Sequence, residues 1–382
     1  MSAALPTVPL REAAQPVSRS IVPSPGETYR QLGVSLWGKG AYEREPVDGG
    51  LTKYQQLFRA ERGDIVVNKI WARNGSVAVV DDSLAGCHGS NEFPMFAPIE
   101  GRLDPRWMHW VTKTKDFWAQ CDQKSQGTSG QNRIKPERFL EVEIPLPPLD
   151  EQRRIVARIE ELAAKLEEAR NLRALSKAAS GAFIASTHAA LAAGHDEPLS
   201  AFLILDEDAV PIDVGNAYPQ AGVRGFGGGL FGKQPVFGGE TTYRAFNRLY
   251  PGALVLSQVK GWEGAIAMTP LELEGYFVSP EYRTFRWRPE RVLPEYMAAL
   301  VPTEFFWGRL KEVTRGVGAR REHTRPERFL ELPFSMPSLE DQHRLLQMYS
   351  SIKAIQDLQD ETAAELDAML PAILDKAFKG EL

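Results

Sequence analysis

The chain has 382 residues, 43% of them apolar and 25% charged, which are the proportions of a folded globular protein long enough for two domains. Its net charge of −5 is concentrated in residues 339–382, which carry 4 basic and 9 acidic residues, and the rest of the chain is nearly neutral. The total charge therefore does not exclude nucleic acid as a partner of residues 1–338. No apolar stretch approaches the roughly 18 residues of a membrane span, and two cysteines cannot form a disulfide framework or a four-ligand zinc site alone.

These features lead us to expect a cytoplasmic protein without a bound metal. Residues 1–10 lack the basic segment and long apolar run of a secretory signal, so none is expected. The six histidines are scattered without the spacing of metal ligands.

Residues 1–148 contain short β-rich runs, such as 64–68 and 76–80, punctuated by glycine and proline, which is typical of a compact α/β or mostly β domain. Residues 150–187 contain no proline, and Ile155, Ile159, Leu162 and Leu166 recur at spacings of four and three. The pattern predicts a first domain over 1–148 and a long helix over 149–187.

The same succession returns in the second half of the chain. Residues 197–338 predict a second globular domain, and residues 339–382 a second long helix with Leu345, Ile352, Ile355 and Leu366 in a heptad-like rhythm. Pro371 is the one residue that could kink or stop its last turns, although Leu374 and Phe378 continue the apolar face after it.

Neither helix can bury its apolar stripe alone. We predict that the two pair as an antiparallel coiled coil that holds the domains at opposite ends, related by an approximate twofold axis. The alternative is that each helix folds back on its own domain. The predicted class is α/β (α+β), with two tandem homologous domains each followed by a long helix.

An internal repeat underlies this organisation. Shifting the sequence by 189 positions aligns the glycines and aromatic residues of the two halves over more than a hundred residues. After one inserted residue, 136–141 are identical with 326–331. The chain is therefore a tandem duplication of about 190 residues.

The duplicated layout, the junction at residues 133–156, which is repeated more loosely at 325–346, and the C-terminal residues 370–382 carry a resemblance to a known family. With these features the chain resembles the specificity (S) subunit of Type I restriction-modification systems. One departure is that the second junction has Glu340-Asp341 where the first has Asp150-Glu151, which looks like drift.

The resemblance implies a non-catalytic subunit with two target-recognition domains, which read the two parts of a split, asymmetric DNA site. It implies double-stranded DNA, two methyltransferase subunits and, through these, restriction subunits as partners. S-adenosylmethionine, ATP and magnesium are then expected in the partner subunits and no cofactor in this chain.

Two glycine-rich segments come near nucleotide-binding motifs. Residues 33–40 lack the Ser or Thr that a P-loop needs after its lysine, and the aligned residues 222–229 lack the lysine. Residues 227–232 fit a dinucleotide-binding spacing, but we predict neither a preceding strand nor a following helix. Both are rejected as nucleotide sites and interpreted as glycine-rich loops, and no catalytic constellation is found.

Basic, amide and aromatic residues gather instead in loops that correspond between the two halves. Residues 102–138 carry 8 basic and 4 acidic residues, and 309–328 carry 7 and 3. Such side chains bind phosphates and base edges, although a solvated loop face is the alternative for each residue alone. The predicted DNA-binding residues are Trp37, Lys39, Lys69, Arg73, Asn74, Lys124, Ser125, Arg133, Arg224, Phe226, Lys260, Trp262, Arg315, Arg320 and Arg321.

The two copies differ in these loops while they share the glycines, so we predict that the two domains read different bases. The helices are expected to dock the partner subunits through Ile155, Ile159, Leu162, Leu166, Leu345, Ile352, Ile355 and Leu366. Two other functions stay open: a stand-alone DNA-binding scaffold without an endonuclease partner, and a nucleotide-dependent enzyme.

Overall fold

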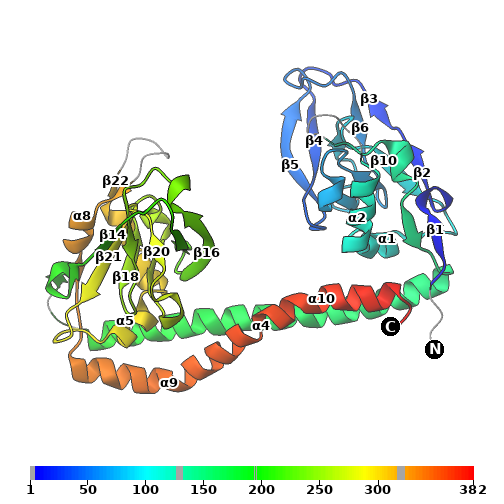
Figure 1. The fold of residues 1–382 in the computed structure, drawn as a ribbon. Helices are drawn as coiled ribbons and strands as arrows, with labels where there is room; N and C mark the ends of the chain where they lie inside the picture. Colours follow the sequence, from blue (N-terminus) through cyan, green and yellow to red (C-terminus); the bar gives the residue numbers. More distant parts are fainter. Residues whose placement is uncertain (1–4, 126–131, 193, 195, 316–322) are drawn as a thin grey trace. The chain divides into compact units, whose positions relative to one another are not determined.

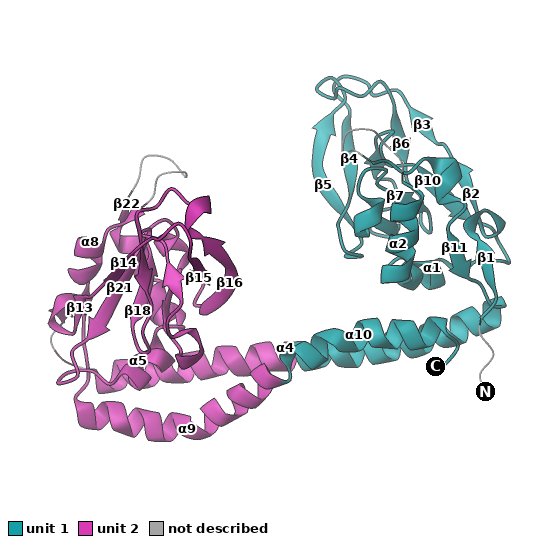
Figure 2. Ribbon diagram, viewed as in Figure 1, with its two compact units in different colours: residues 1–170, 362–382 teal, residues 171–361 magenta. Residues whose placement is uncertain are grey.

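The computed structural model describes residues 5–125, 132–192, 194, 196–315 and 323–382. The chain divides into two compact units: unit 1 comprises residues 1–170 and 362–382, and unit 2 comprises residues 171–361 (Figures 1 and 2). A single helix, α4 (Leu149–Leu191), runs from one unit into the other. Each unit is described separately below.

Unit 1 contains a four-stranded sheet of order β2-β10-β7-β8, a five-stranded sheet of order β3-β6-β9-β4-β5 and the antiparallel pair β1-β11. Most neighbouring strands are antiparallel, but β4 and β9 are parallel. The strands are β1 (Thr7–Pro9), β2 (Ala14–Val17), β3 (Ser20–Ile21), β4 (Thr28–Val34), β5 (Ala41–Asp48), β6 (Leu57–Arg59), β7 (Ile65–Val67), β8 (Val77–Val79), β9 (His88–Gly89), β10 (Met95–Pro98) and β11 (Glu143–Pro145).

Three short helices and two 3-10 turns complete the described globular part of unit 1. They are α1 (Pro105–Val111), α2 (Lys115–Gln123), α3 (Pro136–Phe139) and the turns Leu10–Glu12 and Ala72–Asn74. Asp104 caps α1 and Thr114 caps α2, because each side chain accepts a hydrogen bond from a backbone N–H of the first turn. The main core lies between these helices, the four-stranded sheet and the two long helices, and its largest buried side chain is Trp107.

Unit 2 repeats the two larger sheets and the terminal strand pair of unit 1, and its described residues form one further pair. Its sheets have the orders β13-β21-β18-β19 and β14-β17-β20-β15-β16, with the parallel pair now β15 and β20, and the smaller pairs are β12-β24 and β22-β23. The strands are β12 (Glu197–Pro198), β13 (Leu203–Leu205), β14 (Asp208–Pro211), β15 (Ala217–Val223), β16 (Leu230–Phe237), β17 (Ala245–Arg248), β18 (Leu254–Ser257), β19 (Ile266–Met268), β20 (Phe277–Val278), β21 (Tyr282–Trp287), β22 (Thr314–Arg315), β23 (His323–Thr324) and β24 (Pro333–Phe334).

Its short helices are α5 (Pro294–Leu300), α6 (Glu304–Trp307), α7 (Leu310–Val313) and α8 (Pro326–Leu330), with a 3-10 turn at Gly261–Glu263. The repeated topology explains why glycines and aromatic residues align between the halves.

The long helices pair antiparallel inside each unit. In unit 1, Arg154 of α4 donates a hydrogen bond to the backbone oxygen of Leu382 at 3.0 Å, and Arg170 donates to Asp367 at 3.5 Å. In unit 2, Arg173 donates to the backbone oxygen of Gln359 at 3.1 Å, and Ile184 shares a core with Leu345 and Tyr349. The predicted antiparallel helix pair, and with it the predicted fold class, is confirmed.

The second long helix is interrupted at Thr362 and not at Pro371. It consists of α9 (Leu339–Glu361) and α10 (Ala363–Phe378), and Pro371 lies inside α10. Pro371 therefore does not stop the helix, and the apolar face continues through Leu374 and Phe378. Leu374 and Ala377, which follow it, are buried in the core of unit 1, and this packing holds the last turns helical.

A buried glutamine fixes each long helix to its globular part. Gln152 accepts a hydrogen bond from the backbone N–H of Asp104 and donates to the carbonyls of Arg102 and Pro147, at 2.8 to 2.9 Å. Gln342 makes the same three bonds to Leu293, Arg291 and Pro337. Both side chains are completely buried, so the junction sets the direction in which each helix leaves.

Candidate DNA interface

A β-hairpin tip in each unit is anchored to a neighbouring loop. Between β4 and β5, the backbone N–H of Trp37 donates to the carbonyl of Asn74 at 2.6 Å and that of Gly38 to Gly75 at 3.1 Å. Between β15 and β16, Phe226 and Gly227 make the equivalent bonds to Glu263 and Gly264, at 2.6 and 3.3 Å. The two glycine-rich segments are therefore hairpin turns joined to a second loop.

This arrangement excludes the nucleotide-binding alternatives on structural grounds. A strand does precede Gly227, contrary to expectation, but a second strand and not a helix follows each glycine-rich turn. Phosphate binding by such motifs depends on the N-terminus of a following helix. The rejection of both motifs is therefore supported by the geometry.

Both hairpin tips place an aromatic side chain in a strained backbone conformation. Among the described residues, Trp37 and Phe226 are the non-glycine residues with positive φ, at 62° and 55°. This left-handed region costs an L-residue roughly 1–2 kcal/mol. The side chains are nevertheless 55% and 69% exposed, so they are not held there by burial in a core.

A tryptophan lies beneath each exposed ring. Trp118 of α2 meets Trp37 edge to face at 6.1 Å between ring centroids, and Trp307 of α6 meets Phe226 at 5.7 Å. The space beside each tryptophan requires glycine: a Cβ on Gly75 or Gly264 would lie 2.6 or 2.5 Å from the ring, and φ is positive at both (74° and 70°). The aromatic pair and its glycine are thus a single packed unit.

Cations surround these aromatic residues. Lys113 donates from Nζ to the carbonyl of Gly38 at 3.0 Å, and burial lowers the pKa of this lysine. Lys39 is exposed at the tip of the same hairpin. In unit 2, Arg224 lies 4.3 Å from the ring centroid of Phe231, and Lys311 lies 5.7 Å from that of Trp307.

Two predicted cations, Lys69 and Arg133, meet at one carboxylate. Their side-chain nitrogens lie 3.7 and 3.4 Å from Oε1 of Glu92. The backbone holds the three residues together. The N–H of Lys69 donates to the carbonyl of Glu92 at 3.1 Å, and the carbonyl of Lys69 accepts from the N–H of Ile134, the neighbour of Arg133, at 2.9 Å. We call Lys69, Glu92 and Arg133 the charged triad.

Unit 2 keeps the backbone of this triad and changes its side chains. Gln258 N–H donates to the carbonyl of Glu281 at 2.9 Å, and Thr324 N–H donates to the carbonyl of Gln258 at 2.8 Å. In the internal alignment, Gln258, Glu281 and His323 stand where Lys69, Glu92 and Arg133 stand in unit 1. The carboxylate is shared and the two cationic positions differ.

The loop that anchors the hairpin contributes other predicted residues. Arg73 and Asn74 are half-buried, and Arg73 lies 6.0 Å from the ring of the exposed Trp71. In unit 2, Trp262 is 38% exposed, and Lys260 pairs with Glu263 at 3.6 Å. The predicted residues of this loop therefore lie next to the hairpin tip in both units.

The remaining predictions fall near the second basic segments. Lys124 lies 3.8 Å from Glu141, and the Ser125 hydroxyl donates to the carbonyl of Cys121 at 2.7 Å, so both have partners inside the fold. The backbone of Arg315 belongs to β22, while its side chain and residues Arg320 and Arg321 lie outside the described part of the structure.

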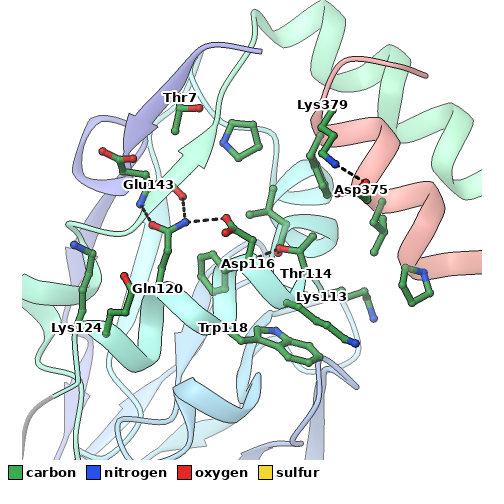
Figure 3. Close-up of a pocket in the computed structure, with 18 residues that line it drawn as sticks. Thr7, Lys113, Thr114, Asp116, Trp118, Gln120, Lys124, Glu143, Asp375 and Lys379 are labelled. Carbon is green, nitrogen blue, oxygen red and sulfur yellow. Dashed lines mark hydrogen bonds and ion pairs between the residues drawn. The ribbon is translucent and has the colours of Figure 1, made fainter. Parts of the chain in front are cut away.

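Two hollows open on unit 1. The larger, about 770 Å³, lies between α2, β11 and α10, with Asp375 and Lys379 on one side and Asp116 and Gln120 on the other (Figure 3). In unit 2 the residues aligned with Asp116 and Gln120 are Phe305 and Arg309; the Phe305 ring lies 5.0 Å from that of His188, and Arg309 stacks on it at 4.7 Å.

The second hollow, about 560 Å³, is lined mainly by polar side chains. Lys53, Tyr54, Gln55, Gln56 and Asn91 contribute to it. Amide and lysine side chains of this kind can bind base edges or phosphates. Asn91 directly precedes Glu92 of the charged triad in the chain.

Most of the helical residues predicted to dock partners lie inside this chain. Ile155, Ile159 and Leu345 are completely buried in the cores that join helix to domain, and Leu166 is 6% exposed. Leu162, Ile352 and Leu366 are half-buried, whereas Ile355 is 55% exposed. The large exposed apolar residues of α4, α9 and α10 are Ile355 and five that were not predicted: Leu172, Leu175, Met348, Leu358 and Met369.

Within the described residues, no cluster of three or more His, Cys, Asp or Glu side chains is arranged to hold a metal ion. The helices of the described ranges include none that is both long and apolar enough to span a membrane.

Residues 35–175 match the family model described as "Type I restriction modification DNA specificity domain". These residues belong to that family. The resemblance to Type I specificity subunits, drawn from the repeat and the junctions, is confirmed. The match ends within α4, so it covers the hairpin tip, the charged triad and the first junction of this specificity domain.

One solved structure has a similar fold over nearly the whole chain. A protein from the study "Structural basis underlying complex assembly and conformational transition of the type I R-M system" has a TM-score of 0.61 and 18% identity, with 99% of this chain and 98% of that chain covered. At this identity the likeness shows the fold.

Two further structures are similar: the HsdS subunit from Thermoanaerobacter tengcongensis (TM-score 0.49, 18% identity, 99% and 97% covered) and a Type I S subunit from M. genitalium (0.47, 13%, 98% and 96%). No curated protein matches the sequence.

Several residues at the interface were missed by the sequence analysis. Glu92 aligns with Glu281, and Tyr54 with Tyr243, at the same offset of 189 that revealed the repeat. Trp118 and Trp307 were recognised as aligned but not nominated. A signal for all of them was present, because each is an identical polar or aromatic residue in the two copies.

Proposed function

We propose that this chain is the DNA-reading, non-catalytic subunit of a Type I restriction-modification complex. Residues 1–148 and 197–338 act as two target-recognition domains for the two parts of an asymmetric bipartite site. The helices at 149–187 and 339–382 act as spacers and as the docking platform for two methyltransferase subunits and, through them, restriction subunits. S-adenosylmethionine, ATP and Mg²⁺ are used by those partners.

The observation that carries this proposal is the difference between the charged triad of unit 1 and the three aligned residues of unit 2. One backbone arrangement presents Lys69 and Arg133 in unit 1 and Gln258 and His323 in unit 2, around the shared Glu92 and Glu281. Arginine and lysine pair with guanine, glutamine with adenine, and a carboxylate with the cytosine amino group. Equal frames with different side chains support two readers of different sequences.

The helices support a docking role through their exposed apolar residues. Leu172, Leu175, Ile355 and Leu358 are between 55% and 65% exposed and lie on the two helical segments of unit 2. Apolar side chains gathered in this way mark protein–protein contacts. The acidic character of residues 339–382 likewise fits contact with protein better than with DNA.

The test is to co-express the chain with a candidate methyltransferase and sequence the methylated adenines of host DNA. We expect a split, asymmetric motif that disappears when this chain is deleted. The double variant Lys69→Gln/Arg133→His, which gives unit 1 the side chains of unit 2, should change one part of the motif only. Methylation of the original motif should fall about tenfold or more, since a bidentate base contact discriminates by about 1–3 kcal/mol.

The matched control is Arg62→Gln, which removes an exposed cation of unit 1 that is paired with Asp82. It should leave the motif unchanged. A complex that methylates the same motif with the double variant would contradict the assignment of the triad. If no methyltransferase complex forms, the stand-alone scaffold becomes the better explanation.

A further inference from the structure

We infer that Trp37 and Phe226 are wedges that insert between stacked base pairs of DNA, one in each part of the site. The inference rests on the proposed function and deepens it, because it assigns a means of reading DNA that needs no hydrogen bond to a base. It starts from the two hairpin tips between β4 and β5 and between β15 and β16 (Figure 1).

The first argument is that each tip keeps a large ring where glycine would suit the backbone. Trp37 and Phe226 have positive φ, and the glycines that follow them, Gly38 and Gly227, share this conformation. The rings are mostly exposed, so packing inside the chain does not account for the strain. Backbone strain of this kind is retained at functional sites, and here it appears in both copies.

The second argument is that the rings are held rigidly. Two backbone hydrogen bonds join each tip to the neighbouring loop, and a buried or half-buried tryptophan supports the ring edge to face. Trp118 is itself fixed, because its indole N–H donates to the carbonyl of Thr112 at 2.7 Å. A side chain that unstacks a base step must keep its position against the stacking energy, and this mount provides that.

The third argument is the charge around the rings. Lys39 is exposed two residues after Trp37, and Lys113 donates to the carbonyl of Gly38 next to it. In unit 2, Lys311 lies against Trp307, the ring that supports Phe226. Arg224, two residues before Phe226, stacks on Phe231. Apolar wedges in DNA-bending proteins are accompanied by cations that hold the phosphates on either side. An exposed aromatic residue that met a protein partner would not need these nearby cations.

A consequence is sequence preference without base contact. Pyrimidine–purine steps unstack at the lowest energetic cost, so each part of the recognised site should contain one at the position of the wedge. Because the wedge is Trp in one copy and Phe in the other, both rings should support the same kind of distortion.

The experiment uses the full complex with its methyltransferase, without S-adenosylmethionine. The DNA duplexes are unmethylated and contain the sequence that the complex methylates. 2-Aminopurine replaces the adenines in and beside the motif, on either strand, one at a time, and its fluorescence reports loss of stacking. We expect a several-fold rise at one step in each part of the motif. Trp37→Gly should abolish the rise in one part only and Phe226→Gly in the other, whereas Trp37→Phe should keep it.

Several controls separate the possible causes. A target adenine flipped by the methyltransferase gives a signal that persists in both glycine variants. Each variant should melt within about 2 °C of the parent protein, since relief of strain offsets the lost ring contact. A rise that Trp37→Gly leaves intact, or no rise in the parent complex, would overturn the wedge while the motif itself still supports the proposed function.

Discussion

Lowering the pH from 7 to 4 is expected to weaken unit 2 through one buried histidine of α4. His188 is 2% exposed, and its Nδ1 lies 2.5 Å from the hydroxyl of Tyr296. The rings of Phe305 and Phe334 lie beside it at 5.0 and 5.1 Å. Burial, together with the positive charge of Arg309, lowers the pKa of His188 from 6.5 to about 4.

The magnitude follows from the difference in proton binding between the folded and unfolded chains. Above pH 6.5 the histidine is neutral in both states, so its protonation takes nothing from the free energy of unfolding. Between pH 6.5 and about 4 the unfolded chain binds a proton that the folded chain does not, so the free energy of unfolding falls with pH. The total loss is about 3 kcal/mol and is complete below the folded pKa.

The internal repeat supplies the control. Phe378 of α10 aligns with His188 of α4 at an offset of 190. In unit 1 its ring meets that of Trp107 edge to face at 5.0 Å, and in unit 2 His188 contacts Tyr296. We therefore compare the parent with His188→Phe/Tyr296→Phe, in which neither a titrating ring nor an unpaired hydroxyl remains. His109, whose pKa burial also lowers to about 4, titrates in both proteins and cancels.

The assay is urea denaturation between pH 4 and pH 7.5, monitored by the hydrogen exchange of amides in β18. These amides lie in unit 2, so their exchange reports the unfolding of that unit alone. The stability of the double variant relative to the parent should rise by about 3 kcal/mol as the pH falls from 7 to 4. A difference that does not change with pH would refute the reasoning.

Two further predictions follow from buried groups. Gln342→Leu leaves the backbone partners at Leu293, Arg291 and Pro337 without their hydrogen bonds and should destabilise unit 2 by about 3 kcal/mol in urea denaturation, whereas Gln347→Leu on the exposed face of α9 should cost less than about 0.5 kcal/mol. Cys87 and Cys121 are completely buried, and burial raises the pKa of both thiols, so neither should react with a disulfide reagent at pH 8 until denaturant is added; rapid labelling of the native chain would contradict this burial.

The sequence by itself determined the duplication, the long helices and the kind of function. These features are local or periodic: an offset of 189 aligns the glycines, residues 136–141 reappear at 326–331, and the apolar spacing of three and four predicts α4 and α9. The junctions could be interpreted for the same reason, because a proline pair and an acidic first turn act within a few residues.

Tertiary structure alone decided which residues meet. Trp37 reaches Asn74 and Trp118 through hydrogen bonds and ring contacts that span 37 and 81 positions, and no periodicity encodes such distances. Packing likewise decides that Pro371 is tolerated inside α10, since Leu374 and Ala377 enter the core of unit 1.

The same holds for the charged triad. Lys69 and Arg133 were singled out for their chemistry, but Glu92, which joins them, lies on a third segment that only the fold brings near. A sequence reports which side chains are available and at what local spacing. The pairing of strands and loops far apart in the chain sets which of them share a surface, and in this protein that pairing builds the surface proposed to read DNA.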